Sequence, residues 1–294
     1  MPARVTQNPK MGIFWMLLTM LLFVSMDACA KFLTQSMHVL EVVWGRYFFH
    51  LLILMILLAP RLKTLMTTSH IRLQLSRSLL LLMTTACFFT GLGYIPMADA
   101  SSIMLTSPIV VTALSMPILK EKVGLRRWAS IVIGFIGALI IIRPGTGMMQ
   151  PAALFPITAA ILYGFFQIST RFLSHSEAVL TSLLYSALIG TILTTLALPF
   201  FWQMPTTSEW LIMISMGMFG GAGQFTLIKS LTIAPAATVA PFNYTNLIWA
   251  TLFGFVIFGD LPDRWTITGA VIIVASGLYI FHREHIRAKK IPAH

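Results

Sequence analysis

Long apolar segments separated by short polar gaps follow one another along the whole chain. Ten of these segments are long enough, or nearly so, to cross a bilayer core of about 30 Å as a helix that rises about 1.5 Å per residue. Lipid offers no water to exposed backbone groups, so apolar runs of this length are predicted to be helices. The predicted spans are residues 11–33, 40–59, 74–95, 98–119, 127–143, 152–173, 178–202, 209–231, 236–258 and 264–282.

The basic residues predict which side of the membrane each gap faces. With a cytoplasmic N-terminus, sixteen of the 20 Lys and Arg residues fall at cytoplasmic ends or loops. Lys31, Arg143 and Arg264 then fall on the outer side, and Arg46 lies within a span. Because cytoplasmic loops are normally the basic ones, this asymmetry predicts that both termini are cytoplasmic, which requires an even number of spans.

The composition excludes a soluble protein and several kinds of site. The chain is 57% hydrophobic and only 10% charged, whereas a soluble domain has about 25% charged residues. Topology accounts for the net charge of +11, so no nucleic-acid partner is predicted. Cys29 and Cys87 lie in apolar runs without metal-site spacing, so neither a disulfide nor a metal is expected. The spans contain no paired acids, HExxH motif or Ser–His arrangement, so we expect no catalytic residue and no cofactor.

A shift of 140 residues aligns the two halves of the chain. KFL at 31–33 then meets RFL at 171–173, and GALIIIR at 137–143 meets GLYIFHR at 277–283. The two matches share one offset and lie at opposite ends of a five-span unit. They therefore indicate an internal repeat.

The predicted repeats are residues 1–146 and 150–290, joined in one membrane-embedded unit. Each contains five spans, and because five is odd, the second repeat begins on the opposite side of the membrane. Inverted repeats of this kind are common in secondary transporters. The predicted fold is an all-α membrane protein with ten transmembrane helices in two inverted five-helix repeats.

Three segments resemble the EamA-type transporters of the drug/metabolite transporter superfamily: EVVWGRYFFH at 41–50, KEKVGLRRWASIVIGFIGALIIIRPG at 120–145 and GDLPDRWTITGAVIIVASGLYIF at 259–281. In the last two, an acid (Glu121 or Asp260) precedes a Gly-rich helix, as at the end of an EamA repeat. The resemblance covers nearly the whole chain. It implies alternating-access movement of small metabolites, often amino acids or their relatives, around a site built from spans 1, 3, 4, 6, 8 and 9. YddG-like exporters of aromatic amino acids and uptake members of the family both remain open.

The first two spans contain charged residues at similar depth. Asp27 lies six residues before the end of span 1 and Arg46 six residues into span 2, so each is about 9 Å deep. A pair between them is geometrically reasonable. They either line a substrate cavity, where Arg46 holds a carboxylate and Asp27 an amine or a proton, or form a fixed ion pair that joins two helices. Lys31 is close enough to the surface to reach it.

Two further spans combine a proline with polar residues. Corresponding interrupted spans in two halves point to a transporter site, although the alternative is helix packing through polar hydrogen bonds. Gln167 occupies the repeat position of Asp27, so any proton site is asymmetric. Gly217 and Gly221 have GxxxG spacing, which predicts close helix packing. The cavity candidates from the interrupted spans are Thr106, Ser107, Pro108, Pro241, Asn243, Tyr244, Asn246 and Trp249.

The sequence thus predicts a transporter, not an enzyme, in a multi-pass plasma membrane, specifically the bacterial inner membrane. Export of small amphipathic metabolites, amino acids or related compounds, by alternating access is the first expectation. Uptake or exchange is the alternative, and an intramembrane enzyme or a scaffold is a remote one. The predicted partners are a small-molecule substrate and the lipid bilayer. Proton coupling, and a monomer or a homodimer, stay open.

Overall fold

The computed structural model of the chain describes residues 8–119, 125–143, 151–173, 177–234 and 239–290, and Glu121 lies outside them. The described residues form helices and turns, without strands. The helices are α1 (Pro9–Leu33), α2 (Val39–Leu58), α3 (Leu62–Leu65), α4 (Ile71–Tyr94), α5 (Met97–Met104), α6 (Ser107–Leu119), α7 (Leu125–Ile142), α8 (Leu154–Leu173), α9 (Val179–Ala197), α10 (Thr207–Ile233), α12 (Thr245–Phe258) and α13 (Arg264–Lys290). Short 3-10 turns are η1 (Ala59–Arg61), η2 (Pro151–Ala153), η3 (Leu198–Phe200) and η4 (Ala240–Tyr244).

The helices coincide with the predicted spans. In the described part of the chain, six helices are long and apolar enough to cross a membrane, and they match predicted spans 1, 2, 3, 6, 7 and 8. Shorter apolar segments match the other four: Met97–Val111, Val132–Ile142, Phe242–Phe258 and Arg264–Tyr279. The all-helical, multi-pass character is therefore confirmed, whereas ten crossings stay a prediction.

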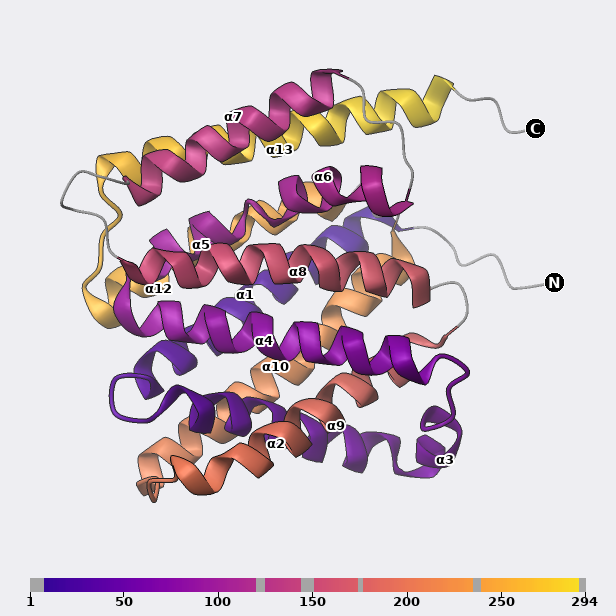
Figure 1. Ribbon diagram of the computed structural model, residues 1–294, viewed down its shortest axis with the longest axis vertical. Helices are drawn as coiled ribbons and strands as arrows, with labels where there is room; N and C mark the ends of the chain where they lie inside the picture. Colours follow the sequence, from indigo (N-terminus) through magenta and orange to yellow (C-terminus); the bar gives the residue numbers. More distant parts are fainter. Residues whose placement is uncertain (1–7, 120–124, 144–150, 174–176, 235–238, 291–294) are drawn as a thin grey trace.

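The helices pack into one bundle (Figure 1). Helices α7 and α13 lie side by side at one edge, α2 and α9 pack together at the opposite edge, and α4 packs on α8 between them. Helix α1 packs chiefly on α10. Helix α1 begins and α13 ends at the same end of the bundle, as an even number of crossings requires. That this end is cytoplasmic stays a prediction.

Local signals define several helix ends. The Asn8 side chain accepts a hydrogen bond from the Met11 backbone at 3.1 Å, and Pro9 supplies a first-turn residue that needs no donor. Helix α10 begins with a reciprocal capping box between Thr206 and Glu209. Helix α12 ends at Gly259, whose φ of 73° is a left-handed conformation that favours glycine.

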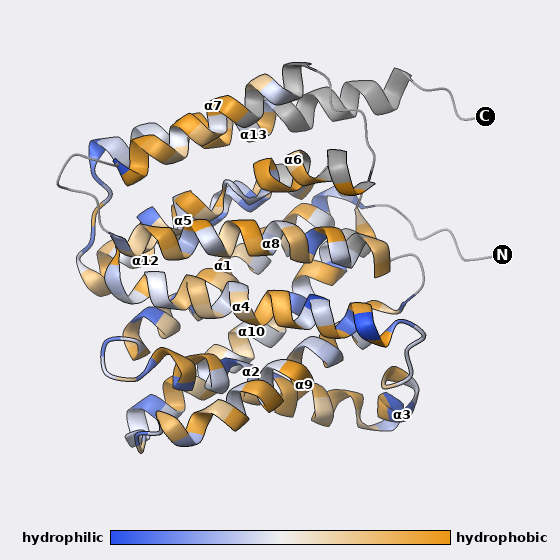
Figure 2. Ribbon diagram, viewed as in Figure 1, coloured by the Kyte–Doolittle hydropathy of each residue, from blue (hydrophilic) through white to orange (hydrophobic). Residues whose placement is uncertain are grey.

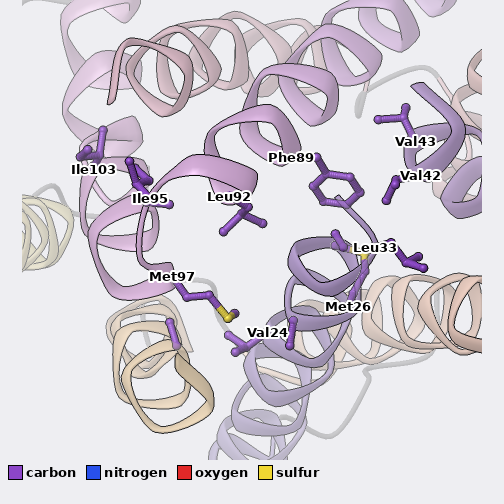
Figure 3. Packing of buried hydrophobic residues seen from close by; sticks show 14 of the residues in the cluster. Val24, Met26, Leu33, Val42, Val43, Phe89, Leu92, Ile95, Met97 and Ile103 are labelled. Carbon is purple, nitrogen blue, oxygen red and sulfur yellow. The ribbon is translucent and has the colours of Figure 1, made fainter. Parts of the chain in front are cut away.

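Apolar residues cover most of the length of the helices in Figure 2. Large apolar side chains on the outside of the bundle remain exposed, among them Leu57, Leu196, Val256 and Val271. Such a surface suits contact with lipid. The buried core joins α1, α2, α4 and α5, and Figure 3 shows Val24, Leu33, Val42, Phe89 and Leu92 within it.

Glycines allow α2 and α10 to approach closely. A Cβ atom at Gly217 would lie 2.4 Å from Phe49 Cβ, and one at Gly45 would lie 2.4 Å from Met213 Cε. A Cβ atom at Gly221 would lie 3.4 Å from the His50 ring. Lipid tails are as apolar as the helices, so small residues and tight packing hold membrane helices together. The close packing predicted from the GxxxG spacing is confirmed, with α2 as the partner.

The two proline-containing spans are interrupted where the sequence predicts it. Helix α5 ends at Met104, and α6 begins at Ser107, immediately before Pro108. In the second half, the turn η4 contains Pro241 and precedes α12. Proline lacks the backbone N–H that a continuous helix requires, which accounts for both breaks.

Candidate functional site

Asp27 is a buried carboxylate on α1 without a direct partner. Its side chain is 7% exposed, and no hydrogen-bond donor among the described residues reaches it. Arg46 is the charged group that acts on Asp27 electrostatically, but no ion pair of 4.0 Å or less joins the two in the described part of the chain. The direct pair considered from the sequence is therefore not formed in this structure.

Arg46 is instead held by neutral side chains of α2 and α4. Its Nη1 donates to Thr85 Oγ1 and lies 3.5 Å from Tyr47 Oη. The Tyr47 and Thr85 hydroxyls are 3.1 Å apart. The guanidinium lies over the Tyr47 ring at 5.0 Å and near the Phe89 ring at 5.7 Å. These contacts orient the cation and leave its charge without a bonded carboxylate.

Helix α8 of the second half faces the same region. The Tyr163 phenol lies within electrostatic range of Arg46, and its ring stacks on Phe166 with centroids 5.5 Å apart. Gln167 follows Tyr163 by four residues, so the two share a helix face. The half-buried Gln167 amide makes no hydrogen bond with the described residues. Asp27, Arg46, Tyr47, Thr85, Phe89 and Tyr163, together with Gln167, are here called the central site.

The central site suits a solute with both an amine and a carboxylate. Asp27 accepts hydrogen bonds and attracts a cation, whereas Arg46 attracts a carboxylate. Hydroxyl groups lie beside the cation, and Phe89 provides an apolar wall. A small number of oriented polar groups within an apolar surround is typical of small-molecule sites.

Lys31 lies one turn beyond Asp27 and does not reach the surface. Its side chain is 8% exposed. Nζ donates to Asp260 Oδ2 at 2.6 Å and to the Ile95 carbonyl at 3.1 Å, and it lies 4.9 Å from the Phe258 ring centroid. The expectation that Lys31 extends to the membrane surface was wrong, because Asp260, an acid 229 residues away in the chain, holds its ammonium group inside the bundle.

At the break between α5 and α6, the side-chain hydrogen bond that forms goes to the backbone. The Thr106 hydroxyl donates to the Ile103 carbonyl at 2.7 Å, which satisfies an acceptor at the end of α5. Ser107 is buried, and its hydroxyl makes no hydrogen bond with the described residues. Pro108 is exposed. Of these three candidates, Ser107 is the one whose buried hydroxyl has no hydrogen-bond partner among the described residues.

The candidate residues of the second interrupted span contact different helices: Tyr244 faces α13 and Trp249 faces α1. The Tyr244 hydroxyl occupies the place of a side chain at Gly277 on α13, because a Cβ there would lie 1.6 Å from Tyr244 Oη. Trp249 packs against the buried cluster that contains Met16 and Met20 of α1, and its buried Nε1 has no partner among the described residues. Half-buried Asn243 and Asn246 also make no side-chain hydrogen bonds in the described part of the chain. Pro241 lies in η4.

Arg77 is the principal polar residue whose setting the sequence did not reveal. The topology prediction places it among the basic residues at cytoplasmic ends, but its side chain is buried between α4, α8 and α9, with only 5% exposed. Its position six residues after the start of α4 is the sequence feature that could have indicated burial. Glu41 was also missed. It is fully buried at the start of α2 and accepts a hydrogen bond from the Gln203 backbone.

A hollow of about 340 Å³ lies away from the central site, between α5, α12 and α13. It is lined mainly by apolar residues, such as Leu247, Ala270 and Val274, and includes neither Asp27 nor Arg46. The electrostatic features of the central site are therefore better evidence for solute binding than the position of this apolar groove.

Comparison with known proteins places this arrangement in context. The EamA-like transporter family matches residues 10–143 and again residues 150–281. The S-adenosylmethionine uptake transporter of Rickettsia prowazekii is 29% identical over 273 residues, covering 93% of each chain. The riboflavin transporter of Vibrio cholerae is 30% identical over 294 residues, covering 97% of this chain and 98% of that one.

A more distant relative is named as an exporter, whereas the Rickettsia relative is named for uptake. The pseudopaline exporter of Pseudomonas aeruginosa is 24% identical and covers 91% of this chain and 94% of its own. One crystal structure superposes with a TM-score of 0.66 at 15% identity and covers 97% of this chain and all of that chain. At this identity, the superposition supports the fold alone.

Proposed function

Because the chain belongs to the EamA-like transporter family and is a multi-pass membrane protein, we propose that it moves a small metabolite with an amino-acid head group across the bacterial inner membrane. The observation behind this proposal is that Asp27 and Arg46 share a buried region without bonding to each other. A buried ionisable residue within a membrane span is a functional candidate by default. The amine of such a solute would pair with Asp27, and its carboxylate would pair with Arg46.

S-adenosylmethionine is the first candidate within this class. It carries an amine and a carboxylate on one carbon, and relatives that cover 93% of this chain are named for its uptake. Free amino acids share the same head group. Riboflavin is the second candidate, favoured by the relative that covers 97% of the chain. Riboflavin has no carboxylate, so it would depend on the aromatic residues rather than on Arg46.

The proposed mechanism is alternating access between two inverted five-helix repeats, residues 1–146 and 150–290, with ten spans and cytoplasmic termini. Contacts at the end of the bundle where α1 ends join the two halves. Lys31 binds Asp260, the Ser36 hydroxyl donates to Glu209 at 2.6 Å, and Trp44 packs against Trp210. We propose that these contacts close the outer end and must separate for a solute to pass there.

Flux measurements in liposomes test the proposal. The purified chain would be reconstituted and offered radiolabelled S-adenosylmethionine, a panel of amino acids and riboflavin, each with and without a pH gradient. Saturable flux of solutes with an amino-acid head group is expected, and decarboxylated analogues should compete poorly. Flux of riboflavin alone would favour the second candidate. No flux of any solute, or covalent turnover without flux, would contradict the transporter proposal.

The same measurements address direction and energy coupling. Preloaded liposomes report export, empty ones report uptake, and preloading with the same solute reports exchange. Our first expectation from the sequence is export, whereas the Rickettsia relatives are named for uptake. Stimulation by an imposed pH gradient would support proton coupling, for which Asp27 is the candidate residue.

A further inference from the structure

A second buried polar group lies between the two halves and borders the central site, because its Arg77 lies within electrostatic range of Tyr163 and Tyr47. It consists of Gln74, Arg77 and Ser78 on α4, Thr170 on α8, and Ser182 and Ser186 on α9. Arg77 and Ser78 both lie on the side of α4 that carries Gln74, because they follow it by three and four positions. Gln74, Ser78 and Ser182 are all buried. We call this group the α4–α8–α9 polar cluster.

Arg77 is the only cation in the polar cluster, and its bonded partners are neutral. Nε donates to Thr170 Oγ1 at 2.8 Å, and Nη1 donates to the Ser182 carbonyl at 3.0 Å and to Ser186 Oγ at 2.9 Å. The guanidinium also lies 4.6 Å from the Phe166 ring centroid. No carboxylate of the described residues lies within ion-pair distance of it. A charge in the membrane interior is normally paired, so this arrangement lacks its usual counter-charge.

Two more polar atoms in the cluster have no partner among the described residues: Gln74 Oε1 and Ser78 Oγ. Folded proteins leave few buried polar atoms unbonded, and a bound water or ion is the usual partner of such an atom. The Ser78 hydroxyl can donate a hydrogen bond. The Gln74 amide can present either its oxygen or its NH₂ group, because the two differ only by a rotation.

We propose that the α4–α8–α9 polar cluster binds a compact anion of the carboxylate or halide class. Arg77 would supply the charge, with hydroxyl and amide donors around it. The chemistry is shared by two sources, a carboxylate of the transported solute and a free inorganic anion such as chloride. Because Arg77 belongs to the first half and its partners to the second, the anion would lie between the halves. This site adjoins the central site but uses a different cation, Arg77 in place of Arg46. Binding of a free anion does not depend on the proposed function, whereas binding of the solute's carboxylate rests on it.

Anion binding can be measured without transport. The full chain in detergent would be heated in sodium gluconate at constant ionic strength, with formate, acetate or chloride replacing gluconate in steps. A ligand of the folded state raises the unfolding midpoint, and for a protein of this size about 1 kcal/mol corresponds to roughly 2–4 °C. We expect a rise of about that size in the native protein, one that grows with the logarithm of the anion concentration once the site is filled. Arg77→Gln should remove it.

Arg72→Gln is the matched control, because Arg72 is an exposed cation on the same helix. It should retain the anion response. If Arg77→Gln does not fold, Arg77→Lys keeps the charge with fewer donors and should require a higher anion concentration for the same rise. Equal anion responses in native protein and Arg77→Gln would overturn the proposal, as would a native midpoint that does not change when formate, acetate or chloride replaces gluconate.

Transport assays separate the two sources of the anion. If the anion is free chloride, replacing it by gluconate should slow solute flux through the native protein but not through Arg77→Gln. If it is the solute's carboxylate, a methyl ester should compete less well than the free acid for the native protein, and equally well for Arg77→Gln. A uniform loss of flux in Arg77→Gln, with neither dependence, would indicate that Arg77 only joins the three helices and would overturn the proposal.

Discussion

Lys31 and Asp27 lie four residues apart on α1, and their charges are compensated in different ways. Lys31 binds Asp260 of the second half at 2.6 Å and a backbone carbonyl as well. Asp27 has only the electrostatic influence of Arg46, without a hydrogen bond from the described residues. One helix thus contributes a satisfied charge to a contact between the halves and an unsatisfied charge to the interior.

The difference suggests separate roles. A satisfied ion pair lowers the free energy of the conformation that contains it, which suits a contact that closes one end of the bundle. A buried charge without a bonded partner lowers the stability of the empty protein and gains most from a ligand. We therefore assign the solute to Asp27 and the closure to Lys31, and the following substitutions test that division.

The largest expected effect is on transport in Asp27→Asn. Loss of one member of a buried, hydrogen-bonded charge pair typically costs about 2–5 kcal/mol, so solute flux should fall by more than about tenfold. Folded yield should stay near that of the native chain because Asp27 bonds no other described residue. Initial flux in liposomes and monodisperse yield measure the two quantities. Glu177→Gln, which removes an acid outside the spans, is the control. Parallel losses of yield and flux would instead make Asp27 structural.

Gly277→Ala separates packing from solute contact in the second interrupted span. The added Cβ would overlap the Tyr244 hydroxyl, and overpacking of this kind costs about 1–3 kcal/mol. We expect a lower unfolding midpoint and a partial recovery when Tyr244→Leu is added. Gly221→Ala is the control, because its Cβ would meet only the His50 ring at 3.4 Å. A normal midpoint in Gly277→Ala would show that Tyr244 is free to turn toward a solute.

Lys31→Met removes the buried cation at the outer end. Breaking a buried pair costs about 3–5 kcal/mol, but the Asp260 side chain is 33% exposed, so we expect about 1–2 kcal/mol. Thermal unfolding in detergent measures the loss, with Lys63→Met at an exposed position as the control. The charge exchange Lys31→Asp with Asp260→Lys should recover part of the stability. An unchanged midpoint in Lys31→Met would remove the ion pair from the proposed closure.

The smallest effect concerns Glu177, which joins the halves outside the spans. Its carboxylate accepts hydrogen bonds from the Thr68 hydroxyl at 2.7 Å and the Ser69 backbone at 3.0 Å. The Thr68 hydrogen bond, followed by those from Ser69, holds the pKa of Glu177 below its ordinary value of 4.5. This contribution to stability is therefore present above the ordinary pKa and disappears as the pH falls through the lowered one.

The unfolding midpoint of the native chain and of Glu177→Gln would be followed from about pH 6 to about pH 3. The advantage of the native chain should be small, because Glu177 is largely solvated, and should vanish at the acidic end. Thr68→Val should behave like Glu177→Gln. A difference between native and Glu177→Gln that grows toward acid would contradict the assigned sign.

Much of the helical framework could be predicted because it depends on local properties. Predicted spans 11–33 and 74–95 correspond to Pro9–Leu33 and Ile71–Tyr94, since apolar length alone defines a membrane helix. The breaks near Pro108 and Pro241 follow from a missing backbone donor. Close packing at Gly217 follows from the absence of a side chain. Each of these features can be recognised without knowing which helix is the neighbour.

The neighbours of the charged residues could not be predicted in the same way. Asp27 and Arg46 have similar depth in the sequence, but depth does not determine the direction of a side chain, and Arg46 turns to Thr85. Arg77 looked like a helix-end cation because its hydroxyl partners come from α8 and α9, about 100 residues later. The sequence by itself therefore determined the helices, their interruptions and the EamA resemblance, all of which depend on local composition and pattern. Only the tertiary structure decided that Lys31 has a partner while Asp27 and Arg77 have no bonded counter-charge among the described residues. Compensation of a buried charge depends on which distant segments surround it.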